Sequence, residues 1–150
     1  MGEMANPRRL DSCAPDGYIG GKGGSPLEEM DTLFFFEGKR EELALYQRFR
    51  EGLRKRGMDC TAAVHKTQIS LRHGLVFACV SMAKVLPKAR RPEHFIVISL
   101  GADRPFPGER IVSVEVRPGR WTNHVVLGAD GDMDDAFWAL TEEAYRFAER

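Results

Sequence analysis

The sequence predicts an α+β fold, namely a single domain with a mainly antiparallel sheet of about five strands. Two observations carry this prediction. An amphipathic helical pattern comes first, and from residue 60 the apolar period changes from three or four residues to two. A second amphipathic segment ends the chain. We therefore expect an N-terminal and a C-terminal helix, both packed on one face of the sheet.

The first helix is predicted between about residues 39 and 56. Its apolar stripe is formed by Leu43, Tyr46, Phe49 and Leu53. Gly57 follows as a typical residue just beyond a helix C-terminus. Before this helix, Phe34-Phe-Phe36 is expected to pack on the core as an apolar anchor.

The last helix is predicted over about residues 133–148. Asp132 or Asp134 can cap its N-terminus, because a short acidic side chain accepts hydrogen bonds from free backbone N–H groups there. The strands are expected at Cys60–Lys66 continued by Gln68–Arg72, and at Leu75–Met82, Phe95–Leu100, Arg110–Val116 and Trp121–Leu127. The short Arg117-Pro-Gly119 link permits only an antiparallel hairpin.

Residues 1–29 are rich in Gly and Pro, and are predicted to be a flexible tail before a domain at residues 30–150. The glycines at residues 20–24 lack the spacing of a phosphate-binding loop. The N-terminus has no apolar signal segment, and no apolar run is long enough to span a bilayer. Three widely spaced cysteines, Cys13, Cys60 and Cys79, indicate reduced thiols. We therefore expect a cytoplasmic protein without a membrane partner.

The charge of the whole chain excludes a general attraction to polyanions, since 22 basic and 22 acidic residues cancel. The distribution is nevertheless uneven. Basic residues dominate from Arg48 to Arg91, where only Glu51 and Asp59 oppose them. On one face they would form a footprint for phosphate backbones; the alternative is an ordinary solvated surface.

Several short motifs resemble a known family, the domain of unknown function 5655. The matching segments are Phe35-Phe-Glu-Gly38, Lys66-Thr-Gln-Ile-Ser70, Phe77-Ala-Cys-Val-Ser81, Arg120-Trp-Thr-Asn-His124 and Ala144-Tyr-Arg-Phe-Ala148. The resemblance implies a small bacterial or archaeal α+β domain with no established reaction. At fold level the chain is also similar to MmcQ/YjbR-like domains, which are suspected of binding DNA. Asn123 stands where the family pattern leads us to expect a second histidine.

The segment Lys66-Thr67-Gln68-Ile69-Ser70 combines a cation, two hydroxyls and an amide. In an extended chain Lys66, Gln68 and Ser70 point to one face and suit an anion, while Thr67 and Ile69 point to the other. The alternative is a solvated strand face.

A second polar set lies at the start of the last strand, where Arg120, Thr122 and His124 alternate onto one face. Beside the Lys66 strand, Arg120 and His124 would join Lys66 in a basic patch. His124 could then act as an acid, a base or a phosphate partner, although a strand histidine is often a structural hydrogen-bonding residue. Trp121 would either stack on a ligand or belong to the core.

No metal or cofactor is predicted. The four histidines lack ligand spacing, and the acidic segment at residues 130–135 fits helix capping better than a calcium loop. We therefore favour a non-enzymatic binding module for an anionic ligand, with nucleic acid as the leading candidate. The alternatives are an enzyme for a phosphorylated or carboxylated small molecule, with His124 as general acid or base, and a protein-interaction domain. A protein partner and a homo-oligomer both stay open.

Overall fold

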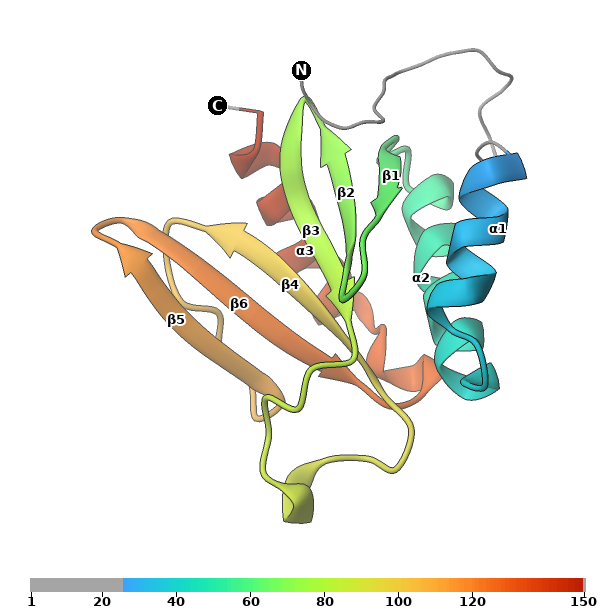
Figure 1. Ribbon diagram of the computed structural model, residues 1–150. Coiled ribbons are helices and arrows are strands. Elements are labelled where there is room, and N and C mark those ends of the chain that lie inside the picture. The colour runs from blue at the N-terminus through green and yellow to red at the C-terminus, as the bar shows by residue number, and fades with distance from the viewer. Residues whose placement is uncertain (1–25, 150) are drawn as a thin grey trace.

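The structure is a computed structural model that describes residues 26–149 (Figure 1). Six antiparallel strands form one sheet in the order β1-β2-β3-β4-β6-β5. The strands are β1 (Thr61–Val64), β2 (Ile69–His73), β3 (Leu75–Ser81), β4 (Ile96–Ala102), β5 (Ile111–Arg117) and β6 (Arg120–Leu127). The predicted α+β class with terminal helices is confirmed.

The helices are α1 (Pro26–Phe35), α2 (Arg40–Lys55) and α3 (Asp135–Phe147), with short 3-10 turns η2 (Lys88–Arg90) and η3 (Asp130–Asp132). The N-cap of α3 is Asp134, whose side chain accepts from the N–H of Phe137 at 2.9 Å. Gly57 follows α2 with φ of 73°, a left-handed conformation that glycine adopts without strain. Both predicted helices are thus found within two or three residues of the expected bounds.

Two details differ from the expectation. The stretch expected as one extended segment is a hairpin, because His65 N–H bonds the carbonyl of Gln68 at 2.8 Å and closes a turn at Lys66 and Thr67. This hairpin accounts for the sixth strand. Helix α1 already begins at Pro26, a residue well suited to the first helical position, so part of the expected tail is helical. The remainder of that tail, residues 1–25, lies outside the described residues.

The core lies between α2, α3 and one face of the sheet, with α3 behind the sheet in Figure 1. Ile98 and Leu100 of β4 are fully buried against the helices. Phe49 of α2 stacks on Trp138 of α3 with ring centroids 5.7 Å apart. Gly52 makes this contact possible, because a Cβ atom there would lie 2.2 Å from the Trp138 ring. The two helices are therefore held together by an aromatic contact that needs a glycine.

None of the α-helices among residues 26–149 packs on the opposite face of the sheet, and we call it the open face. The loop between β3 and β4 covers one end of it, where Leu86 and Phe95 pack on Val97 and Val126. Figure 1 shows this loop at the lower end of the sheet, in front of the strands. The rest of the open face carries partly exposed side chains of β3, β4 and β6.

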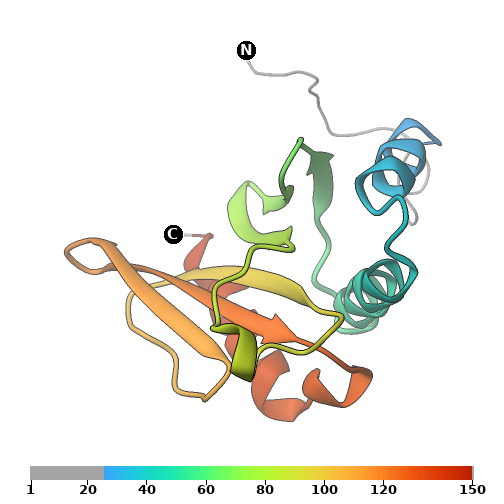
Figure 2. The same ribbon diagram turned by 60° about the horizontal axis from the view of Figure 1, so that its bottom comes forward.

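Helix α1 lies beside the edge strand β1 (Figure 2). Several of its apolar side chains face solvent. Leu27, Met30, Leu33 and Phe34 are each more than half exposed, whereas Phe36 is buried and Phe35 half-buried. Only part of the expected Phe34–Phe36 anchor therefore packs on the core. An exposed apolar row is a feature of interaction surfaces. None of the described helices combines the length and apolar character needed to cross a membrane.

Candidate functional site

The residues of the first predicted set lie at the β1–β2 hairpin. Lys66 and Thr67 form its turn and are exposed, as is Gln68. Ser70 is buried in β2 and points to the open face, since its neighbours Ile69 and Leu71 are buried in the core. The predicted alternation therefore holds from Ile69 onward, but Lys66 sits in a turn and not on the strand face.

The residues of the second set lie in β6. Arg120 is exposed at its start, and its guanidinium lies over the ring of Phe147 in α3 at 5.2 Å. Trp121 is half-buried, which places it between the two expected roles of core residue and stacking platform. His124 is half-buried on the open face, where it pairs across the strands with Ser99 of β4.

The structure does not bring Lys66 together with Arg120 and His124. Strands β3 and β4 lie between β2 and β6, and the register places Ile69 at the level of Val125. From that level Lys66 and Arg120 extend in opposite directions, which separates them by roughly 20 Å or more along the strands. Both views agree with this separation. The β5–β6 turn lies at the left, far from helices α1 and α2, whereas the β1–β2 hairpin lies on the side of these helices (Figures 1 and 2).

A polar row crosses the open face instead. Ser70, Cys79, Ser99 and His124 are successive cross-strand partners on β2, β3, β4 and β6. Ser99 Oγ and His124 Nδ1 form a hydrogen bond of 2.7 Å, and Ser70 Oγ lies 3.9 Å from Cys79 Sγ. Sequence reasoning missed Cys79 and Ser99 as members of a site, because only the strand order aligns them with His124.

Burial decides the charge state of this row. Desolvation lowers the pKa of His124 below its ordinary value of 6.5, which favours the neutral imidazole at neutral pH. Desolvation also raises the pKa of Cys79, although its contact with Ser70 partly opposes this. The row therefore presents hydroxyls, a thiol and a neutral imidazole, which form hydrogen bonds but supply no positive charge for an anion.

The lowered pKa of His124 predicts how stability depends on pH. Below pH 6.5 the unfolded chain takes up a proton on this residue more readily than the folded chain, so acidification reduces the free energy of unfolding. A His124→Gln variant should lose this part of the pH dependence in urea unfolding at neutral pH and at about pH 5. In an NMR titration the imidazole should show a midpoint below 6.5. A midpoint at or above that value would contradict the assignment.

Basic residues divide into two groups. Three arginines of α2 have carboxylate partners within the molecule, since Arg48 pairs with Asp130, Arg50 with Glu28 and Arg54 with Glu51. Arg40 and Lys55 of the same helix form no ion pair among the described residues. Residues 60–92 contain no acidic residue but include Lys66, Arg72, Lys84, Lys88, Arg90 and Arg91. Within the described part of the chain, none of this second group forms an ion pair. The basic excess of the sequence is thus partly neutralised on α2 and unpaired between residues 60 and 92.

Three of these unpaired cations lie beyond the same ends of strands β2 and β3. Ile69 pairs with Val80, so the hairpin turn with Lys66 lies at the same end as the loop that follows β3 with Lys84 and Lys88. All three lysines are exposed. We call Lys66, Lys84 and Lys88 the basic end; the β1–β2 turn lies near the middle of Figure 1, and the β3–β4 loop with η2 extends below it.

Two arginines hold the loop of the basic end in place. Arg90 Nη2 donates to the carbonyl of Glu109 at 2.6 Å. Arg91 Nη1 donates to the carbonyl of Leu86 at 3.2 Å, and its guanidinium lies over the ring of Phe95. Glu93 is an exposed acid that ends this loop. The loop is therefore fixed by its arginines, while its lysines point their charge at solvent.

The acidic segment after β6 has structural roles, as its capping interpretation predicted. Asp132 Oδ2 accepts from the N–H groups of Gly128 and Ala129 at 2.7 and 3.1 Å, and its other oxygen pairs with Arg110. Asp134 caps α3. These contacts use the carboxylates that a calcium loop would need.

The fold and these surfaces define a class, an antiparallel α+β domain with helices on one face of its sheet. Comparisons with known proteins do not assign the chain to a narrower class, because no protein-family model, no curated protein and no solved structure matches it.

Proposed function

We propose that this chain is a non-enzymatic binding module that takes an anionic ligand at its basic end, with nucleic acid as the leading candidate. The observation that carries the proposal is the contrast between the two groups of cations. Arg48, Arg50 and Arg54 of α2 are paired with internal carboxylates, whereas Lys66, Lys84 and Lys88 are exposed and have no such partner among the described residues. Unpaired lysines at one end of a sheet supply the point charges that phosphates attract.

The neighbouring residues fit the same ligand. Thr67 and Gln68 are exposed next to Lys66 and offer hydrogen-bond donors for phosphate oxygens. Arg90 and Arg91 fix the loop that carries Lys84 and Lys88, which reduces the entropy lost when the loop meets a ligand. Because the net charge of the chain is zero, the electrostatic field of the whole molecule would not attract an anion. The local positive charge of the basic end would direct binding instead.

Two further expectations belong to this proposal. Membership of the domain of unknown function 5655 family continues to rest on the motifs of the sequence, including the hairpin segment that contains Lys66. A cytoplasmic location is supported by Cys60 and Cys79, which are both free thiols with a raised pKa caused by burial.

The test is fluorescence anisotropy of the full chain with short labelled single-stranded and double-stranded oligonucleotides over a range of salt. We expect affinity in the micromolar range that falls steeply with salt. A Lys66→Ala/Lys84→Ala/Lys88→Ala variant should bind at least about tenfold more weakly at low salt. Its log–log salt slope should be smaller by up to about three, since each phosphate contact contributes about 0.9.

A matched control removes the same charge at the other end of the molecule. The Lys55→Ala/Arg117→Ala/Arg120→Ala variant should bind like the wild type, because these exposed side chains lie at the end of α2 and at the β5–β6 turn, away from the basic end. An equal loss in both variants would mean that binding follows total charge and would contradict the proposal. Absence of binding by the wild type at low salt would also contradict it.

A second candidate function is favoured by the hydrogen bond between Ser99 and His124. A neutral imidazole 2.7 Å from a serine hydroxyl can accept its proton, so the pair has the geometry of a nucleophile and its general base. In this alternative the substrate would lie on the open face beside Cys79 and Gly101, where space above the glycine is free. Lys66 and Arg120 would take no part, because both lie far from His124.

A further inference from the structure

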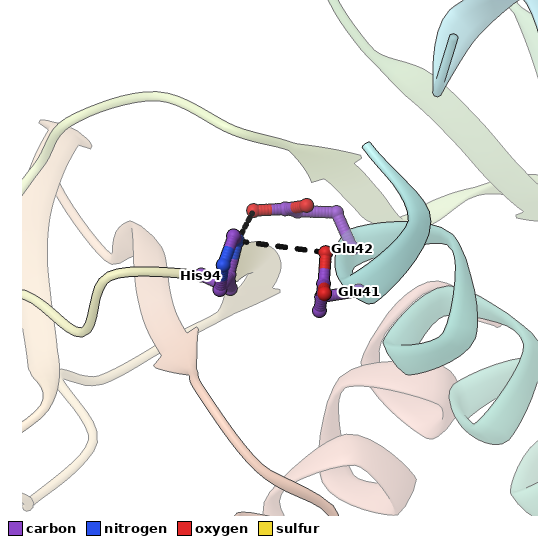
Figure 3. A group of neighbouring side chains, drawn as sticks. All are labelled: Glu41, Glu42 and His94. Atoms are coloured by element: carbon purple, nitrogen blue, oxygen red, sulfur yellow. Dashed lines mark hydrogen bonds and ion pairs between the residues drawn. The ribbon is translucent and has the colours of Figure 1, made fainter. Parts of the chain in front are cut away.

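Three side chains from two distant segments converge at the start of α2. Glu41 and Glu42 lie in the first turn of that helix, and His94 lies just before β4. Nδ1 of His94 is 3.2 Å from Oε2 of Glu42 and 3.8 Å from Oε1 of Glu41. Figure 3 shows both carboxylates directed at this nitrogen. The three ligand atoms lie within 4.8 Å of one another.

Glu42 has an unpartnered oxygen. Its side chain is only 8% exposed, and its Oε1 is buried without a hydrogen-bond partner. No lysine or arginine pairs with Glu42 in the described part of the chain. A buried carboxylate oxygen without a donor is costly, and native proteins satisfy nearly all such groups. Apart from His94, which carries a charge only when it is protonated, the described residues place no cation against this carboxylate, so the arrangement can accept an external cation.

The spacing fits a metal ion. Metal–ligand bonds of about 2.0–2.2 Å place neighbouring ligand atoms roughly 3–3.5 Å apart. The distances from Nδ1 to the two carboxylates, 3.2 and 3.8 Å, are close to this range. All three ligand atoms lie within 4.8 Å of one another, so the exposed Glu41 side chain would move inward to complete the site. The helix N-terminus opposes a cation with about half a positive charge, but the two carboxylates contribute two negative charges and outweigh it.

We propose that Glu41, Glu42 and His94 bind a divalent first-row transition-metal ion such as Zn²⁺. One imidazole nitrogen with two carboxylates suits these ions better than Ca²⁺ or Mg²⁺, which prefer oxygen ligands alone. Three protein ligands leave at least one position for water or an external ligand, as in open metal sites. The sequence predicted no metal site, because His94 is 52 residues from Glu42 and the three residues match no metal-binding motif.

The proposal is independent of anion binding and is tested by calorimetry on the full chain with ZnCl₂. We expect one ion per chain, together with an increase in Tm, since an ion that binds the folded state stabilises it. His94→Ala and Glu41→Gln should each weaken Zn²⁺ binding by about tenfold or more. Glu41 is 62% exposed, so its variant keeps the test valid if substitution of the buried Glu42 impairs folding.

His65→Ala is the matched control, because it removes an exposed histidine of the β1–β2 hairpin. Its affinity and stoichiometry should equal those of the wild type. Zn²⁺ binding that is unchanged in both His94→Ala and Glu41→Gln would place the ion elsewhere, for example on the cysteines, and would overturn the proposal. Absence of any binding heat at roughly 0.1 mM Zn²⁺ would also overturn it.

Discussion

A Phe49→Ala variant is expected to lose about 3–5 kcal/mol of unfolding free energy, the range for removing a buried phenylalanine. The Phe49 side chain is fully buried in α2. It stacks on Trp138 and meets Phe137 edge-on at 6.0 Å, so it joins α2 to α3. A cavity there cannot be filled easily, because Trp138 is also held against Gly52. Such a loss is a large share of the 5–15 kcal/mol typical of a domain.

Urea unfolding measures this loss, and Phe34→Ala provides a matched control. Phe34 is 66% exposed on α1, so its removal should change the unfolding free energy by no more than about 0.5 kcal/mol. A loss below about 1 kcal/mol for Phe49→Ala would show that the two helices are not joined through this ring.

An Asn123→Ala variant is expected to lose about 2–4 kcal/mol, because each buried polar group left without a partner costs about 1–3 kcal/mol. Asn123 is fully buried on the helix-covered side of β6. Its side-chain oxygen accepts from the N–H of Phe106 at 2.9 Å and from Ser113 Oγ at 2.5 Å. Its side-chain nitrogen donates to the carbonyl of Arg104 at 3.2 Å. The residue thus ties the β4–β5 loop and strand β5 to the core.

Thr122→Ala is the control for this substitution. Thr122 is the neighbouring residue in β6 and is half-buried on the open face, so its substitution should lower the free energy of unfolding only slightly. Amide hydrogen exchange should show faster exchange at Phe106 in Asn123→Ala than in the wild type. Equal stability and equal exchange would contradict the role given to this side chain.

The position of Asn123 also bears on the second histidine that the sequence resemblance led us to expect there. Adjacent residues of a strand point to opposite faces, so the side chain of residue 123 lies in the core while His124 lies on the open face. A histidine at residue 123 could not share a ligand with His124. A metal site made of two neighbouring histidines is therefore excluded by the geometry of the strand.

Apolar periodicity in the sequence predicts a helix or strand well where the same apolar side chains are buried in the core. The stripe through Tyr46, Phe49 and Leu53 predicts α2, and all three residues are buried as expected. The β1–β2 hairpin escapes prediction because its turn residues, Lys66 and Thr67, belong to none of the usual turn formers. Helix α1 is missed because its apolar side chains largely face solvent, so they form no core-facing stripe.

The arrangement of the candidate site could not be predicted in the same way. Only two hairpins are evident from short links, β5–β6 at Arg117-Pro-Gly119 and β2–β3 at the turn Arg72-His-Gly74. The insertion of β3 and β4 between β2 and β6 separates Lys66 from His124, and it aligns Ser99 with His124 instead. Contacts such as His94 with Glu42 join segments that no local pattern relates. Long-range pairing therefore decides the site, whereas local periodicity decides the elements.

The most direct test of the proposed function is to locate the ligand on the molecule by NMR. The isotope-labelled full chain would be titrated with a short oligonucleotide at low salt, and the backbone amide shifts followed. The proposal predicts that the largest changes occur at residues 65–68 and 82–91, the hairpin turn and loop that carry Lys66, Lys84 and Lys88. Changes centred on Ser99 and His124, with the basic end unaffected, would contradict it and would favour a site on the open face.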